Sequence, residues 1–178
     1  NSCKLLIIQG KGDSFCSGGN IKKMSTKSKK KTTISNKIDE LYQKQLDLTH
    51  MISSFEFPTI ASITGPAAGA GFSLALSCDI RIGNKDAFFL SNYSKIGLSG
   101  DYGISWYLAN LLGDSKAKEL MFINNRIYAD EAYKVGLLNF LFKKNFENKL
   151  EEIKDKILSQ SPLAINLIKK NIKFARKH

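Results

Sequence analysis

The chain alternates between short apolar runs and longer stretches in which apolar residues recur with helical spacing. A short apolar run bounded by glycine, proline or polar turn residues predicts a buried strand. Such runs occupy residues 4–8, 59–63, 78–82, 87–90 and 138–142. Because helical segments separate most of these runs, the pattern is typical of βαβ units and of the α/β class.

The first helix is expected over residues 34–55, where an apolar stripe is interrupted at Gln45 and stopped by Pro58. Further helices are expected at residues 72–77, 104–112, 115–122 and 129–135. Two terminal helices follow, separated near Ser161 and Pro162, because proline suits a first helical turn. The helices and strands together account for most of the chain.

The 178 residues fit one domain at about 150 residues per domain, and the 43% hydrophobic content can build a sizeable core. No apolar run approaches the ~20 residues of a membrane span. Three widely spaced cysteines predict neither a disulfide framework nor a zinc site, and no metal is expected. We therefore expect a cytoplasmic protein, with an organelle matrix as the alternative because a segment before Asn1 is expected to be missing.

The formal charge of +11 favours anionic partners: nucleic acid, a membrane surface or a phosphate-bearing small molecule. Much of this charge lies in one lysine-rich run over residues 22–31, interleaved with serine and threonine. Such a composition is typical of a solvated loop, and charge alone does not choose among the partners.

Two glycine-rich loops could carry chemistry, at residues 14–20 and 64–71. In the first, Gly18 and Gly19 allow positive φ and a close approach of a ligand to the main chain. In the second, Ala70 begins a helix, where unpaired N–H groups and the helix dipole favour an anion. The loops form either a pair of tight turns or an oxyanion hole.

Four segments in order resemble the signatures of the crotonase (enoyl-CoA hydratase/isomerase) superfamily. The first is Ser-Phe-Cys-Ser-Gly-Gly-Asn-Ile-Lys-Lys-Met at residues 14–24, and the second is Ala-Ser-Ile-Thr-Gly-Pro-Ala-Ala-Gly-Ala-Gly at residues 61–71, followed by residues 74–79. Residues 95–98 and 126–137 are similar to the third and fourth. The resemblance covers nearly the whole chain.

This resemblance implies a crotonase-like spiral of ββα units with C-terminal helices, without the family's usual N-terminal strand and helix. It implies that residues 1–142 form the core with the site, and that residues 143–178 form a truncated helical segment for assembly and for covering the site. The implied partner is an acyl-CoA thioester, with no cofactor beyond the coenzyme A of the substrate, and the implied assembly is a homotrimer or hexamer.

By the same resemblance, the backbone N–H groups of Ser17 and Ala70 polarise the thioester carbonyl. Substrate-binding positions carried over from the family are Cys16, Gly18, Gly19, Asn20, Lys22, Lys23, Gly69, Gly71 and Tyr93. The two lysines are candidate contacts of the CoA phosphates.

Hydratases of the superfamily carry two glutamates, and the matching positions are Ser73 and Tyr93. Neither side chain at its ordinary pKa replaces a carboxylate as a general base near neutral pH. Asp101 matches the position of an aspartate in some isomerases of the family, so double-bond isomerisation is favoured over hydration or another lyase reaction. The alternative role for Asp101 is capping the helix that follows Gly103.

Two rivals belong to other classes. A serine hydrolase would use Ser73, but the two histidines, His50 and His178, are poorly placed for a triad. A non-catalytic RNA-binding or regulatory protein would use the lysine run over residues 22–31. No aromatic residue interleaves that run, so nucleic acid is not the expected partner.

Overall fold

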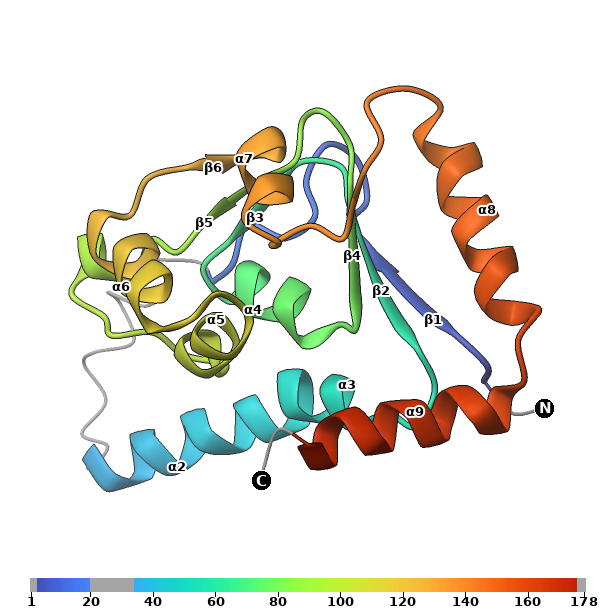
Figure 1. Ribbon diagram of the computed structural model, residues 1–178. Coiled ribbons are helices and arrows are strands. Elements are labelled where there is room, and N and C mark those ends of the chain that lie inside the picture. The colour runs from blue at the N-terminus through green and yellow to red at the C-terminus, as the bar shows by residue number, and fades with distance from the viewer. Residues whose placement is uncertain (1–2, 20–33, 176–178) are drawn as a thin grey trace.

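The computed structural model describes residues 3–19 and 34–175 and has the predicted α/β class. Its main sheet has the strand order β1-β2-β4-β7, with every neighbouring pair parallel: β1 (Leu6–Gln9), β2 (Thr59–Ile63), β4 (Ile80–Gly83) and β7 (Phe140–Leu141). Each of these strands lies within or next to an apolar run that predicted it. Figure 1 shows helices on both faces of this sheet.

The central strand β2 is buried at all five positions, which explains its continuous apolar sequence. Alternate side chains point to opposite faces of a strand. Ala61 and Ile63 join the larger core with α4 (Ala70–Ser77), whereas Ile60 packs with Ile82 and with Leu150 of α8 (Phe146–Leu158). The strand thereby separates two apolar clusters, one on each face of the sheet.

A second sheet has the order β3-β5-β6, formed by β3 (Pro66–Ala68), β5 (Phe88–Leu90) and β6 (Ile127–Tyr128). Strand β3 follows β2 after a short turn and leads directly into α4. The sequence predicted β5 but neither β3 nor β6, which have three and two residues and lack an apolar run of strand length. The β3–α4 connection places the second glycine-rich loop at the edge of this sheet.

The predicted helix over residues 34–55 is present but is not uniform. It consists of α2 (Ile34–Gln45), a π-helical turn η1 (Leu46–His50) and α3 (Met51–Ser54). The polar Gln45 that interrupts the apolar stripe is the last residue before the π turn. Wider π turns change which side chains face the core, and they occur frequently at functional sites.

The remaining elements are η2 (Ser94–Ile96), α5 (Ile104–Leu112), α6 (Asp114–Ile123), α7 (Ala129–Lys134) and α9 (Pro162–Ala175). Helix α5 has the predicted bounds, and α4 begins at Ala70, two residues before the predicted start. Figure 1 shows α4, α5 and α6 together on one side of the main sheet, with α8 on the other. Across residues 3–19 and 34–175, no helix has both the length and the apolar character needed to cross a membrane.

Candidate oxyanion and proton-transfer site

The first glycine-rich loop is held along β3 by backbone hydrogen bonds. The N–H groups of Phe15 and Cys16 both donate to the Pro66 carbonyl, at 3.1 and 3.0 Å, and the Cys16 carbonyl accepts from Ala68 at 2.9 Å. The buried Phe15 side chain anchors the loop in the core. Ser17, which follows Cys16, therefore lies beside the connection between β3 and α4.

Two glycines allow the loops to touch. A Cβ on Gly71 would lie 2.0 Å from the Cys16 carbonyl oxygen, so only glycine lets α4 pack against the first loop. Gly18 has φ of +83°, and a Cβ there would lie 2.6 Å from the Ala68 carbonyl and 3.4 Å from the Ala70 nitrogen. Gly18 thus sits directly against the amide that begins α4.

The second loop presents the amide of Ala70 at the start of α4. The N-cap Gly69 has φ 53° and ψ −123°, and its N–H donates to the Leu90 carbonyl at 2.9 Å. The first residues of a helix have no intrahelical acceptor for their N–H groups. In the described part of the chain, neither the Ser17 nor the Ala70 N–H donates to a protein acceptor. These two amides can therefore bind a negatively charged oxygen.

Ser73, one turn along α4 from Ala70, contacts the loop that carries the carboxylate of Asp101. The Tyr93 hydroxyl donates to Oδ1 of Asp101, and the Ser73 hydroxyl donates to the Asp101 carbonyl at 3.2 Å. Ser73 follows Ala70 by three residues and therefore lies on the same helix face. Ser73 is fully buried and Tyr93 is 4% exposed, so both hold the aspartate from inside the protein.

The capping role considered for Asp101 is wrong. Gly103 is the N-cap of α5, and no side chain of the described residues caps this helix end. The Asp101 carbonyl accepts from Ile104 at 3.2 Å, while its carboxylate faces Tyr93. The side chain is therefore directed to the site.

Burial governs the titration of this pair. Desolvation raises the pKa of Asp101 above its ordinary value, and the hydrogen bond from Tyr93 partly offsets that rise. Burial, and then the hydrogen bond to Asp101, raises the pKa of Tyr93, so this phenol stays protonated and remains a donor. Two unpaired amides can polarise a carbonyl, and a half-buried carboxylate can take up a proton.

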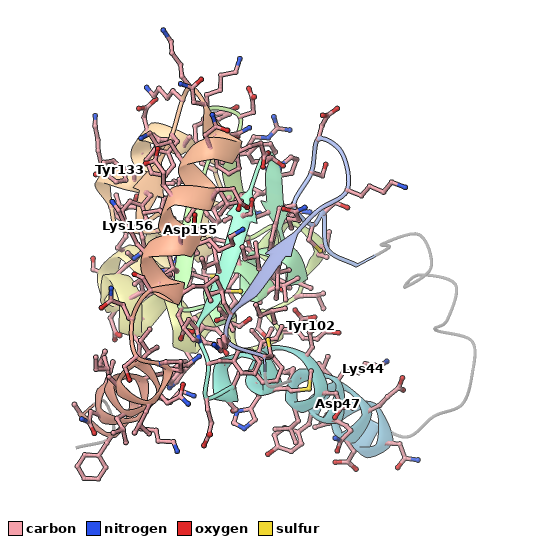
Figure 2. The ribbon with its side chains drawn as sticks, turned by 90° about the vertical axis from the view of Figure 1, so that its right-hand side faces the viewer. Lys44, Asp47, Tyr102, Tyr133, Asp155 and Lys156 are labelled. Atoms are coloured by element: carbon pink, nitrogen blue, oxygen red, sulfur yellow. The ribbon has the colours of Figure 1, made fainter. Side chains whose placement is uncertain are left out.

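The π turn also holds the loop that carries Asp101, through hydrogen bonds of Thr49. The Thr49 hydroxyl donates to the Tyr102 carbonyl at 3.0 Å, and Tyr107 donates to the Thr49 carbonyl at 3.1 Å. Tyr102 has φ of +50°, a conformation that is uncommon for a bulky residue. Figure 2 shows Tyr102 close to Asp47 and Lys44, the labelled residues of the α2–η1 helix.

Sequence reasoning did not identify Thr49. It is a polar residue inside the amphipathic helix of residues 34–55, and it is only 2% exposed. A buried threonine in such a helix is a weak signal, because threonine can also bond back to its own helix. Its distant partner could not be read from the sequence.

The serine hydrolase alternative is not supported by the geometry. The Ser73 hydroxyl donates to a main-chain carbonyl, and the residue is fully buried. His50 instead places a ring nitrogen 3.5 Å from the Ser54 hydroxyl on the exposed side of its helix. A nucleophile and its base must lie within hydrogen-bonding reach, and Ser73 and His50 have other partners.

Three predicted substrate contacts, Asn20, Lys22 and Lys23, lie outside the described residues. The other predicted positions lie on the two loops or on the turn that carries Tyr93. Within the described ranges, no group of histidine, cysteine, aspartate and glutamate could hold a metal ion.

A cavity of about 950 Å³ lies elsewhere, between the π turn, α5 and α9. Its lining includes Leu76, Trp106, Ile168 and Cys78, but it does not include Ser17, Ala70 or Asp101. Burial raises the pKa of Cys78 to about 12, which keeps this thiol protonated. We place the candidate chemistry at the loops, because the unpaired amides of Ser17 and Ala70 and the carboxylate of Asp101 lie there and do not line the cavity.

The chain matches the family described as enoyl-CoA hydratase/isomerase over residues 1–177. It is 28% identical over 97% of its length to 4-chlorobenzoyl coenzyme A dehalogenase-1 of Arthrobacter sp., and 29% identical over 99% to the mitochondrial Delta(3,5)-Delta(2,4)-dienoyl-CoA isomerase of Pongo abelii. The chain spans 62% and 56% of those two proteins.

The same likeness appears in three dimensions. The crystal structure of an enoyl-CoA hydratase from Polaromonas sp. JS666 superimposes with a TM-score of 0.89 at 31% identity, covering 98% of this chain and 67% of that one. This confirms the predicted crotonase-like fold. The match over residues 1–177 and this structural agreement show that the chain belongs to the enoyl-CoA hydratase/isomerase family.

Proposed function

We propose that the protein moves a carbon–carbon double bond within an enoyl-CoA thioester, through an enolate held by the amides of Ser17 and Ala70. The observation that carries the proposal is the placement of Asp101. Its backbone is bound by Ser73 one helical turn from Ala70, and its carboxylate is oriented by Tyr93. These two contacts support Asp101 as the base next to the proposed position of the thioester carbonyl.

The two amides stabilise charge that develops only when the proton leaves. Removing a proton from the carbon beside the carbonyl puts negative charge on the carbonyl oxygen, and each preorganised donor there contributes ~2.7–4 kcal/mol. Helix α4 adds its positive dipole end at Ala70. The contact between Gly18 and the Ala70 amide supports this proposal, because it brings both loops to one point.

In this scheme Asp101 takes the proton and returns it to a carbon further along the acyl chain of the substrate. The electron pair of the broken C–H bond enters the enolate and forms the shifted double bond, so no oxidant, reductant or water is consumed. The raised pKa of Asp101 favours this role, since a general base works best when its pKa approaches the operating pH. A carboxylate has about four acceptor sites, so the Tyr93 bond leaves capacity for the proton.

Hydration is disfavoured by the same residues. Ser73 and Tyr93 occupy the positions that match the two hydratase glutamates, and both hydroxyls are already committed as donors to Asp101. The pKa of Tyr93 is raised, which makes its phenolate still less available as a base. A site with a single carboxylate is better suited to moving a proton than to activating water, which in the hydratases of the superfamily involves two glutamates.

The rest of the proposed assembly follows the family resemblance. We propose Lys22 and Lys23 as contacts of the CoA phosphates, no cofactor beyond the CoA of the substrate, a homotrimer or hexamer, and a cytoplasmic location. Each of these proposals concerns the whole protein. The chain spans 62% of the length of 4-chlorobenzoyl coenzyme A dehalogenase-1.

The test incubates the protein separately with a 3-enoyl-CoA, a 2-enoyl-CoA and 4-chlorobenzoyl-CoA. Conjugated thioester absorbance, hydroxyacyl-CoA formation and chloride release are followed in parallel. The proposal predicts that 3-enoyl-CoA gains conjugation and that neither hydroxyacyl product nor chloride accumulates. Hydration of 2-enoyl-CoA without any double-bond shift, or chloride release, would contradict it.

A further inference from the structure

A buried asparagine outside the site binds the turn between Leu90 and Tyr93. Asn124 follows α6 with φ of +60° and is 2% exposed. Its Oδ1 accepts from the Asn92 N–H at 2.6 Å and from the Ser91 hydroxyl at 2.8 Å. One side-chain oxygen thus binds two successive residues at the end of β5.

The segment bound by Asn124 reaches both halves of the site. On one side, the Leu90 carbonyl accepts from Gly69, the N-cap that sets the direction of the Ala70 amide. On the other side, Tyr93 donates to Asp101. Between them, Asn92 has φ of +57°, so the turn is a tight one whose shape needs support.

Within the described part of the chain, only the oxygen of the Asn124 side-chain amide has hydrogen-bond partners. Among the described residues, the buried Nδ2 of Asn124 has no hydrogen-bond partner. A buried donor without a partner costs about 1–3 kcal/mol. Glycine would satisfy the positive φ without that cost, so the side chain contributes something that φ alone does not require. The structure assigns that contribution to the two bonds accepted by Oδ1.

We propose that Asn124 is a positioning residue for the reaction, acting through the Leu90–Tyr93 turn on both the Ala70 amide and the Asp101 carboxylate. The inference rests on the proposed function for its kinetic consequence. A misplacement of about 1 Å in a catalytic group can cost roughly 100-fold in rate. A loosened turn would therefore lower kcat more than it would lower the affinity for substrate.

Three variants separate this role from a structural one. Asn124→Gly removes the acceptor and keeps the backbone conformation, while Asn124→Asp keeps an acceptor at Oδ1. Asn145→Gly is the matched control, because Asn145 also has positive φ, at +53°, but is exposed and lies at the start of α8. All are assayed below their melting temperatures, with 3-enoyl-CoA as the substrate.

We expect Asn124→Gly to lower kcat by about 10- to 100-fold with KM nearly unchanged. Asn124→Asp should recover most of kcat, and Asn145→Gly should match the wild type. An Asn124→Gly protein that is less stable but has wild-type kcat would reduce the residue to a structural role and overturn the proposal. Failure of Asn124→Asp to recover any kcat would contradict the role of Oδ1.

Amide hydrogen exchange gives a readout that does not need turnover. Asn124→Gly should speed exchange at Gly69 and Asn92 at least about tenfold, and leave unchanged the Asn84 amide, which donates to Ile63. Unchanged exchange at Gly69 would overturn the proposal. If the wild type turns over no enoyl-CoA, the proposed function fails, and exchange alone decides whether Asn124 holds the turn.

Discussion

The Tyr93 hydroxyl donates a hydrogen bond to Oδ1 of Asp101, joining the end of β5 to the loop before α5. Tyr93 is almost fully buried, whereas Asp101 is half-buried at the site. The phenol therefore holds the carboxylate from the protein interior. This bond favours the charged form of Asp101, while burial disfavours it more strongly.

Tyr93→Phe should move the pH dependence of activity. The hydrogen bond lowers the pKa of Asp101, so its loss lets burial raise that pKa further. Because the base must be ionised, the acidic limb of the kcat/KM profile should move to higher pH. The measurement is a pH–rate profile of both proteins with 3-enoyl-CoA. A limb that stays in place or moves to lower pH would show that Tyr93 does not tune the base.

Asp101→Asn should change the pH dependence of stability. Folding raises the pKa of Asp101, so its contribution is complete below the unfolded value of about 3.9 and is lost as pH rises through the folded pKa. Asparagine does not titrate. The wild type should therefore lose stability relative to the variant as the pH rises from the unfolded pKa of about 3.9 through the higher folded pKa. Urea unfolding at several pH values measures this difference, and a relative gain by the wild type contradicts it.

Gly18→Ala and Gly12→Ala form a matched pair. Their φ values are +83° and +85°, so both variants should lose about 1–2 kcal/mol from backbone strain. A Cβ at Gly12 has nothing within 4 Å, whereas one at Gly18 meets the Ala68 carbonyl beside the Ala70 amide. Only Gly18→Ala should also lose activity, by at least about tenfold if one oxyanion donor is displaced. Equal specific activities of the two folded variants would remove Gly18 from the site.

Thr49→Val and Thr49→Ser test the support of the Asp101 loop. Valine removes the hydroxyl and leaves the Tyr102 carbonyl unpaired, which should cost about 1–3 kcal/mol of unfolding free energy and lower kcat. Serine keeps the donor and should recover most of kcat. Thermal unfolding and single-turnover kinetics provide the two readouts. A Thr49→Val enzyme with wild-type kcat would confine Thr49 to stability.

Local sequence features predicted the main elements. The five apolar runs correspond to β1, β2, β4, β5 and β7, and α5 has its predicted bounds because glycines flank it on both sides. The strands β3 and β6 were missed because two or three residues carry no periodic signal. The π turn was missed because its geometry follows from packing that a stripe of apolar residues does not describe.

Part of the candidate site could likewise be predicted from local sequence, and part depends on tertiary contacts. Glycines that permit a close approach are visible as local motifs, so the two loops could be predicted before their contact was known. The contact between Ser73 and Asp101 could not be predicted, because the two residues lie 28 residues apart along the chain. Asn124 and Thr49 are more distant still from the residues they support, and only the tertiary structure brings them together.

The most direct test of Asp101 follows proton exchange on the substrate in deuterated water. Wild type, Asp101→Asn and the exposed control Asp86→Asn are incubated with a 3-enoyl-CoA, and NMR records both the double-bond position and deuterium uptake, at the carbon beside the thioester carbonyl and at the carbon that receives the proton. We predict that the wild type and Asp86→Asn shift the double bond, while Asp101→Asn is slower in both processes by about 100- to 10,000-fold with unchanged thioester binding. Wild-type rates in Asp101→Asn would contradict the account.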